Sequence, residues 1–305
     1  MSEKKQGPHV VAIGGGRGLA TALRAARRYA ADITAVVSVA DNGGSSGLLS
    51  AAYGLVAPGD LRKCLVALAA ENHIAADVFE YRFDAGPLGG HSVGNVVIAG
   101  LEAVCGGILP ALEACTSLLG CAGRVLPVST QRMQLEAELE GGDIVRGQAH
   151  ITAQATRIRR IRIHPFDSKP APGVLEAITA ANQVIIGPGS LYTSVIPPLL
   201  VEGVREAVSE SRALKVYVCN LMGQRAESVG LTAVDHYRAL IEHGICCDVL
   251  LYHPWGRDAP EGAVLEGNLT TLGHETKAVA CYLADSSDPS SHDPLALATA
   301  LSNLG

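Results

Sequence analysis

Short apolar runs alternate with amphipathic segments along most of the chain. The first run, Val10–Ile13, stops at a glycine-rich turn, and residues 19–29 then place apolar or small side chains at helical spacing with arginines opposite. Residues 33–39 are β-branched and almost wholly apolar, which suits a parallel strand buried on both faces. The chain therefore begins as strand, tight loop, helix and strand.

The same alternation continues to the C-terminus. Helical spacing predicts helices over residues 61–70, 96–104, 109–119, 174–181 and 235–243 and from Pro294 onward, with Asp60 and Asp293 as N-caps. Apolar runs predict strands over residues 184–186, 215–219, 249–252 and 278–283. Strands that alternate with helices predict an α/β, Rossmann-like three-layer fold with a mostly parallel sheet.

The period changes over residues 125–163. Residues 134–140 alternate between apolar and polar side chains, Gly141-Gly142-Asp143 supplies a turn, and residues 144–151 alternate back. Residues 157–162 alternate arginine with isoleucine, which is typical of a half-exposed strand rather than a binding patch. We therefore predict one α/β domain over residues 1–305, with a small antiparallel β insertion over 125–163.

Glycine-rich loops follow three of the predicted strands, at residues 14–18, 41–47 and 187–194. Such loops let backbone N–H groups approach an anion, although they also serve as packing turns or solvated turns. Right-handed crossovers bring the carboxyl ends of parallel strands to one edge of the sheet, where ligands bind. We therefore expect one site for a nucleotide, a nucleotide sugar or another phosphorylated small molecule.

The candidate ligand contacts are backbone donors, hydroxyls, amides and a few charged side chains near these loops. They are Gly15, Gly16, Arg17, Gly18, Asp41, Asn42, Gly43, Gly44, Ser45, Arg62, His91, Asn95, Gly187, Ser190, Tyr192, Thr193 and Asn220. His91 opens a predicted helix, where it either meets an anion or packs. Asp60 is read first as a structural cap.

Two named phosphate motifs are incomplete in the first loop. The dinucleotide fingerprint that starts at Gly14 requires glycine or alanine where Leu19 stands, and no Lys-Ser or Lys-Thr pair completes a Walker loop. Asp41 lies at the end of the second strand, where a ribose-binding carboxylate is expected. A nicotinamide-type nucleotide therefore remains open without being favoured.

Composition excludes several classes of protein. The 305 residues are 48% hydrophobic, yet Gly, Pro or charge interrupts each apolar run before the ~18 residues that a membrane helix needs. A net charge of −6 gives no field that attracts nucleic acid. The eight cysteines form no C-x-x-C pair, which disfavours a zinc site. The polar N-terminus resembles no signal peptide, so we expect a cytoplasmic protein, and we also expect a homo-oligomer.

Six sequence blocks together resemble the gluconeogenesis factor (YvcK-like) family and, more distantly, the 2-phospho-L-lactate transferases (CofD-like). The blocks are residues 14–19, 39–47, 58–65, 90–95, 186–194 and 217–222. The resemblance implies a Rossmann-like fold, a uridine-diphosphate-sugar ligand and a regulatory role in cell shape and envelope growth on gluconeogenic carbon sources. It also implies that no cofactor is required.

The transferase branch implies an alternative, metal-dependent function. Those enzymes move a phospholactyl-type group from a guanylyl-activated donor onto a deazaflavin with help from a divalent metal. On that reading Asp41 with Asp60 would position Mg²⁺, His91 would stabilise charge, and Arg17 or Arg62 would clamp phosphate. The chain departs from the family pattern at Arg17, where Thr or His is usual, and at Asn42, where a second carboxylate is usual. The lost carboxylate favours binding without catalysis.

Overall fold

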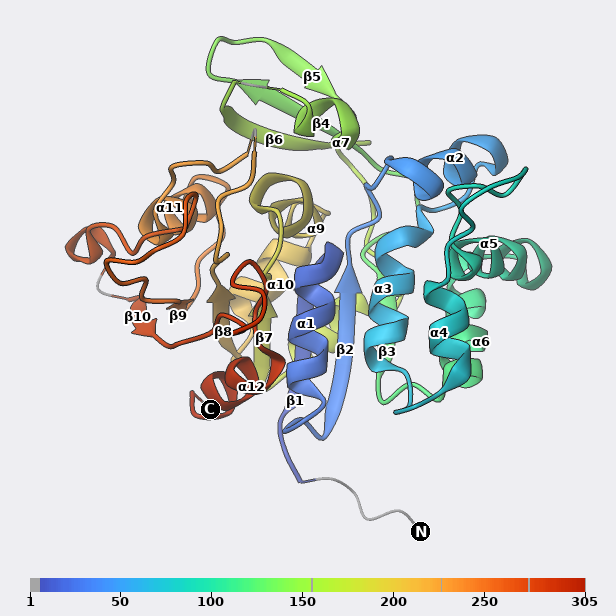
Figure 1. The fold of residues 1–305 in the computed structure, drawn as a ribbon, viewed down its shortest axis with the longest axis horizontal. Helices are drawn as coiled ribbons and strands as arrows, with labels where there is room; N and C mark the ends of the chain where they lie inside the picture. The colour runs from blue at the N-terminus through green and yellow to red at the C-terminus, as the bar shows by residue number, and fades with distance from the viewer. Residues whose placement is uncertain (1–5, 155, 226, 274, 305) are drawn as a thin grey trace.

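A parallel sheet with helices on both faces forms the body of the protein, and a small antiparallel sheet stands above one edge of it (Figure 1). The computed structural model describes residues 6–154, 156–225, 227–273 and 275–304. All pairings in the seven-stranded sheet are parallel. The predicted α/β fold with a mostly parallel sheet is therefore confirmed.

The large sheet has the strand order β10-β9-β8-β7-β1-β2-β3. Its strands are β1 (His9–Gly14), β2 (Asp32–Val37), β3 (Arg124–Pro127), β7 (Gln183–Ile186), β8 (Leu214–Val218), β9 (Val249–Tyr252) and β10 (Lys277–Ala280). The strands at the centre are buried along almost their whole length, which explains why they read as continuous apolar runs.

Helices cover both faces of this sheet. The α-helices are α1 (Gly16–Ala26), α2 (Gly44–Tyr53), α3 (Pro58–Leu68), α4 (Ile74–Glu80), α5 (Val93–Cys105), α6 (Ile108–Leu119), α7 (Gln148–Thr152), α8 (Val174–Ala180), α9 (Ile196–Leu199), α10 (Val204–Glu210), α11 (Ala233–Glu242) and α12 (Pro294–Ser302). Helix α1 packs between α12 and α3 on the near face, while α9 and α10 lie behind the sheet (Figure 1). A π-helix, Leu191–Val195, and a 3₁₀-helix, Leu269–Thr271, complete the elements of the described residues.

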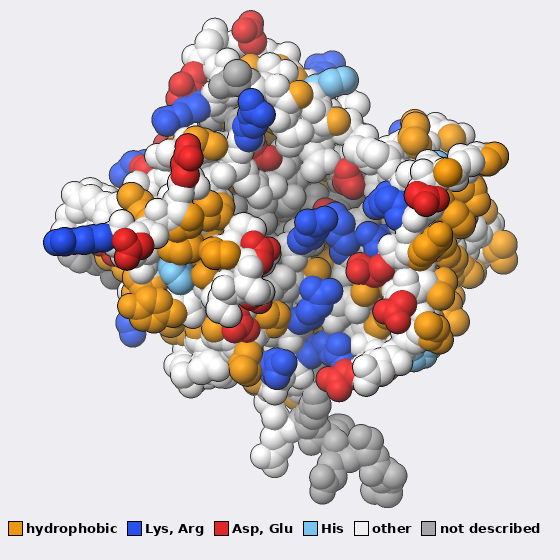
Figure 2. Space-filling model, in the orientation of Figure 1, with side chains coloured by type: hydrophobic (Ala, Val, Ile, Leu, Met, Phe, Trp, Pro, Cys, Tyr) orange, Lys and Arg blue, Asp and Glu red, His pale blue; other side chains and the backbone are white. Residues whose placement is uncertain are grey.

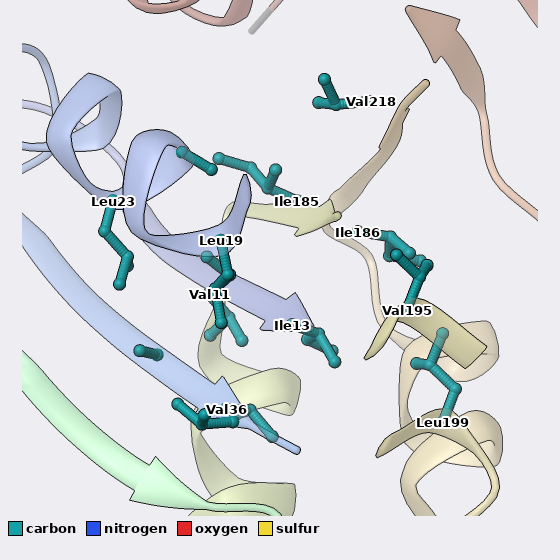
Figure 3. Packing of buried hydrophobic residues seen from close by; sticks show 14 of the residues in the cluster. Val11, Ile13, Leu19, Leu23, Val36, Ile185, Ile186, Val195, Leu199 and Val218 are labelled. Atoms are coloured by element: carbon teal, nitrogen blue, oxygen red, sulfur yellow. The ribbon is translucent and has the colours of Figure 1, made fainter. Parts of the chain in front are cut away.

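The hydrophobic core lies between the sheet and its two helical layers. Figure 3 shows Leu19 and Leu23 of α1 on one side of the central strands and Val195 and Leu199 on the other. Ile13, at the centre, is fully buried. This close packing fixes where β1 ends and α1 begins, and so positions the first glycine-rich loop.

The antiparallel insertion is shorter than predicted. Its strands are β4 (Gln134–Leu139), β5 (Ile144–Arg146) and β6 (Ile158–His164), in the order β5-β4-β6. Residues 124–127 instead pair with β2 in the large sheet, so the predicted start at residue 125 was wrong. The second strand of the hairpin was predicted over residues 144–151, but it ends at Arg146. Residues 148–152 form α7 after Gly147, which has φ +88°.

Four further details of the helices and strands differ from the prediction. Residues 44–47 belong to α2 rather than to a loop, and residues 191–194 belong to the π-helix. The last strand ends at Ala280 rather than residue 283. Asp60 is not an N-cap: α3 begins with Pro58 after Ala57, so Asp60 lies inside the first turn. Asp293 does cap α12, accepting from the N–H groups of Leu295 and Ala296.

Two predictions from composition can be compared with the structure. All eight cysteines are free thiols, with only Cys105 and Cys246 exposed. Of the helices that the described residues form, none has the length and apolar content to cross a bilayer.

Candidate functional site

The sheet changes direction of winding between β1 and β7. The chain runs from β1 to β2 and β3 on one side, then crosses to β7 and continues outward through β8, β9 and β10 on the other. Open α/β sheets bind ligands in the crevice beyond the carboxyl ends of the strands at such a switch point. The loops after β1 and β7 are therefore the first place to look for a site.

These two loops touch through glycine. A Cβ at Gly18 would lie 2.3 Å from the carbonyl oxygen of Pro188, and one at Gly189 would lie 3.2 Å from the carbonyl oxygen of Gly15. Gly16 and Gly187 adopt φ of +70° and +73°, a region that favours glycine. The loops after β1 and β7 therefore form one continuous wall, as predicted from their positions after parallel strands.

The N-terminus of α1 opens onto this wall. Gly15 is the N-cap, and among the described residues no side chain caps the helix. The first N–H groups of α1 have no helical acceptor, and the helix dipole adds partial positive charge at this end. Backbone donors thus gather at the switch point, where Gly15 and Gly16 were predicted to contact a ligand.

Asn220 joins the wall to the end of β8. Its side-chain oxygen accepts a hydrogen bond from the N–H of Gly189 at 3.0 Å. The residue is only 9% exposed, and its Nδ2 has no partner among the residues that the structure describes. A buried amide donor without a partner is costly unless a ligand or water satisfies it. Asn220 therefore stays a candidate ligand contact.

Two carboxylates lie on the β2 side of the first loop. A Cβ at Gly15 would lie 2.6 Å from Oδ2 of Asp60, and one at Gly59 would lie 2.8 Å from Oδ2 of Asp41. Asp60 accepts from Lys63 at 2.8 Å, and Asp41 accepts from the N–H of Gly43 at 2.9 Å. Burial, and next the charge of Asp60, raise the pKa of Asp41. This pair was predicted together only for the enzyme alternative.

Four predicted residues form one chain of hydrogen bonds behind these carboxylates. Ser45 Oγ lies 3.1 Å from Nδ1 of His91 and accepts from Nδ2 of Asn95 at 3.1 Å. Arg62 donates to the Asn95 side-chain oxygen at 3.2 Å and pairs with Glu80 at 3.3 Å. Arg62 is 6% exposed and burial lowers its pKa. The guanidinium therefore braces α3 against α5.

Asn42 reaches the antiparallel insertion. Its side-chain oxygen accepts from the N–H of Ala149 in α7 at 2.9 Å, and a Cβ at Gly147 would lie 2.6 Å from its Nδ2. The predicted contact of Asn42 with sugar hydroxyls remains a prediction. What the structure assigns to this side chain is a tie between the loop after β2 and the insertion.

Sequence reasoning missed Glu227, which fixes the segment after Ser190. Its carboxylate accepts from the N–H groups of Tyr192 and Thr193 at 3.1 and 3.3 Å, and from the Thr193 hydroxyl at 2.7 Å. The hydroxyl of Thr193 is therefore engaged within the protein, and Tyr192 is 5% exposed. Burial raises the pKa of Glu227. No periodic pattern marks this residue in the sequence.

Basic and acidic side chains are mixed around the site (Figure 2). Figure 2 shows Lys and Arg side chains gathered over α1 and the upper part of α3, below a hollow under the small sheet whose surface is mostly backbone and uncharged side chains. Arg17 lies exposed in the first turn of α1. Within the described ranges, no three His, Cys, Asp or Glu side chains gather as a metal-binding group would.

Comparison with known proteins gives consistent similarities. The family model described as 2-phospho-L-lactate transferase CofD matches residues 10–300. A gluconeogenesis factor of Halalkalibacterium halodurans is 43% identical over 80% of this chain and 77% of its own length. A gluconeogenesis factor of Bacillus subtilis is 40% identical over 79% of this chain and 76% of its own length.

A solved structure has the same fold. The crystal structure of a UPF0052 family member from Bacillus halodurans superposes with a TM-score of 0.90 at 37% identity. The match covers 97% of this chain and 99% of that one. The small sheet above the large one is therefore part of an arrangement that the two proteins share.

Proposed function

This chain belongs to the 2-phospho-L-lactate transferase CofD family, and we propose that it is a regulatory protein of the gluconeogenesis factor type that binds a uridine-diphosphate sugar. The observation that carries the proposal is the uncapped N-terminus of α1 at the switch point between β1 and β7. A diphosphate placed there meets backbone N–H groups and a helix dipole. The protein then acts in the cytoplasm, as a homo-oligomer.

The contacts divide by chemistry. The loop at Gly14–Gly18 offers backbone donors to the diphosphate, and Arg17 adds a cation at the open end of α1. The N–H groups of Gly187 and Gly189 already donate to Ile13 and Asn220, so the β7 loop supports the first loop without donating to the ligand. Asp41 offers a carboxylate to ribose or sugar hydroxyls on the β2 side. Ser190 is partly exposed directly after the β7 loop, so its hydroxyl is the nearest side-chain donor to offer the ligand on that side. A ligand held in this way needs no net positive charge on the protein.

Calorimetry with UDP-glucose and UDP-N-acetylglucosamine tests the proposal. We expect saturable binding, and Ser190→Ala should weaken it about fivefold, the loss of ~1 kcal/mol for one hydrogen bond. Ser209→Ala is the matched control, because that exposed serine on α10 lines a cavity of 760 Å³ near the start of β8, away from the loops. Absence of binding heat at millimolar ligand would overturn the proposal.

The regulatory role has its own test. A bacterium that lacks its gluconeogenesis factor should regain normal shape on gluconeogenic carbon sources when it expresses this chain. The binding-defective variant from calorimetry should restore shape less well at equal abundance. Full rescue by a variant that no longer binds the nucleotide sugar would separate the cellular role from the ligand.

A second function is favoured by the closeness of Asp41 to Asp60. Mg²⁺ commonly binds through one or two carboxylates together with substrate phosphates, and both carboxylates lie beside the loop predicted to hold phosphate. The residues present therefore fit a divalent cation that neutralises phosphate charge during transfer. In this alternative the protein is a transferase acting on a nucleotide-activated substrate.

The two functions can be distinguished with Asp41→Asn. For a transferase, this substitution should abolish release of guanosine monophosphate from guanylyl-activated phospholactate in the presence of a deazaflavin and Mg²⁺. It should also abolish binding of Mn²⁺ as monitored by electron paramagnetic resonance, while the thermal midpoint stays within a few degrees. Wild-type protein that neither turns over this donor nor binds Mn²⁺ would exclude the transferase.

A further inference from the structure

Three aromatic rings meet at the carboxyl ends of β9 and β10. The centroids of His253 and Trp255 are 4.2 Å apart, and Tyr282 meets His253 edge-on at 5.8 Å and 84°. His253 and Trp255 follow β9 directly, and Tyr282 follows β10. We call these three residues the aromatic cluster. None of them was among the residues predicted to contact a ligand.

Hydrogen bonds hold the cluster in one orientation. Nδ1 of His253 accepts from the N–H groups of Leu283 and Ala284 at 2.9 and 3.1 Å. The indole N–H of Trp255 donates to the carbonyl oxygen of Leu221 at 3.1 Å. These bonds leave the ring faces to packing or to a ligand. Side chains fixed in advance lose little entropy when a ligand binds.

The outer ring of the cluster faces solvent. Tyr282 is 79% exposed, and its phenol makes no hydrogen bond among the described residues. Because its ring is exposed, Tyr282 does not serve to fill the core. Next to the other two rings it forms an apolar surface at the edge of the sheet. Such a surface suits a planar ring, because base and aromatic faces stack with little dependence on the identity of the base.

The cluster lies on the same edge as the anion site, at a distance that a nucleotide spans. β9 is three strand intervals from β1, which is ~14 Å at the usual spacing, comparable with an extended nucleoside diphosphate. Asn220 follows β8 by two residues, between the two places, and its buried Nδ2 has no partner among the described residues. The hydrogen bond from the Trp255 indole goes to the carbonyl oxygen of Leu221, the residue after Asn220.

The segment that follows β10 runs along the near face of the sheet, between the aromatic cluster and α1 (Figure 1). After β10 the chain, red in Figure 1, returns across the front of the sheet beside the upper part of α1. His292 on this return donates from Nε2 to the carbonyl oxygen of Cys219 at 3.1 Å, directly before Asn220. The N-terminus of α1, Asn220 and the aromatic cluster thus lie along one edge on one side.

We propose that the aromatic cluster stacks the base of a nucleotide whose diphosphate lies at the N-terminus of α1, with Nδ2 of Asn220 donating to the nucleoside between them. This inference rests on the proposed function and specifies its base subsite. It directs the nucleoside toward β8 and β9 rather than toward Asp41 after β2. Asp41 would then face the sugar attached to the diphosphate.

Fluorescence of Trp255, the single tryptophan of the chain, reports on this subsite directly. UDP should quench the emission in a saturable way, with the same dissociation constant that calorimetry gives. Pyrophosphate, which lacks the base, should bind by calorimetry and leave the emission unchanged. Quenching by pyrophosphate equal to that by UDP would overturn stacking, because the signal would then not depend on the base.

Variants at Tyr282 separate stacking from an indirect effect. Tyr282→Leu should weaken UDP binding about fivefold or more and leave pyrophosphate binding unchanged. Tyr282→Phe is the matched control, which keeps the ring and should bind UDP as the wild type does. Because Tyr282 is exposed, both variants should fold as the wild type does. If Tyr282→Leu binds UDP normally and UDP does not quench Trp255, the base lies elsewhere and the inference fails, while the proposed function stands. If UDP does not bind at all, both fail.

Discussion

The hydroxyl of Thr193 donates to the buried carboxylate of Glu227 at 2.7 Å, and the N–H groups of Tyr192 and Thr193 donate to the same carboxylate. Glu227 therefore fixes the segment that follows the β7 loop. Glu227→Ala should lower the free energy of unfolding by about 2–4 kcal/mol, because three buried donors lose a charged acceptor. Urea unfolding measures this loss.

Glu227→Gln is the control for shape, since it keeps one acceptor oxygen and the volume of the side chain. It should cost less stability than Glu227→Ala and retain more affinity for UDP-glucose, because Ser190 stays closer to its position. Equal losses for the two variants would contradict a role in hydrogen bonding and indicate a role in packing alone.

Gly18 is the closest point between the first and third loops. Its missing Cβ would lie 2.3 Å from the Pro188 carbonyl oxygen and 2.9 Å from the Gly189 nitrogen, both backbone atoms. Gly18→Ala should therefore lower the free energy of unfolding by about 2–3 kcal/mol, as an overpacked core does. Gly100→Ala is the matched control, because that helical glycine is exposed with open space around it. It should raise stability by about 0.5–1 kcal/mol. Similar effects at both positions would contradict the close approach.

The parts of this fold that the sequence predicts are those with a strong local pattern. The apolar runs at Val10–Ile13 and residues 249–252 became strands, and the helical spacing after Leu19 became α1. Parallel strands end at one edge, so the meeting of the glycine-rich loops after β1 and β7 also followed from order alone. The family pattern then indicated the class of ligand, which no periodicity carries.

The failures arise where tertiary contacts outweigh local preference. Gly44-Ser45-Ser46-Gly47 has the composition of a turn, yet Ser45 is buried against His91 and Asn95 and the segment opens α2. Pro58 favours the first helical position, which moved the cap away from Asp60. The partners of Glu227 come from segments 34 residues or more distant, and spacing gives no information on such pairs.

Asn42 should hold the antiparallel insertion against the loop after β2. Asn42→Ala removes the acceptor of the Ala149 N–H, so amide exchange at Ala149 and its neighbours in α7 should become faster and stability should fall by about 1 kcal/mol. Hydrogen exchange followed by mass spectrometry measures the first effect. Asn42→Asp keeps the acceptor oxygen and should exchange as the wild type does. Unchanged exchange in Asn42→Ala would mean that β4 and β5 hold α7 without help from Asn42.

Stability should fall in acid because of His236. Burial lowers the pKa of His236 to about 4, and its Nδ1 lies 3.2 Å from the Tyr217 hydroxyl. The unfolded chain takes up this proton near pH 6.5, whereas the folded chain does so only near pH 4. The contribution of His236 is therefore fully present above pH 6.5 and is lost as the pH falls to about 4, for a total of roughly 3 kcal/mol.

Urea unfolding at a series of pH values measures this slope. His236→Gln should flatten it between pH 6.5 and 4 without removing it, because burial also lowers the pKa of His292 to about 4. The double variant, with His292→Gln added, should be flatter still. A slope that is the same in the wild type and in His236→Gln would contradict a neutral, buried imidazole at this position.

Arg17 places a cation in the first turn of α1, where the helix dipole disfavours it. Arg17→Thr should therefore raise the free energy of unfolding of the free protein by about 0.3–1 kcal/mol at low salt. The same variant should weaken UDP binding about tenfold at low salt, since a charge-assisted contact to phosphate is lost, and the difference should shrink at 1 M salt. Arg17→Lys, which keeps the charge, should lie between the two. If Arg17→Thr gains stability and binds UDP as tightly as the wild type, the cation has no part in holding the diphosphate, and the backbone N–H groups of Gly15–Gly18 carry that contact alone.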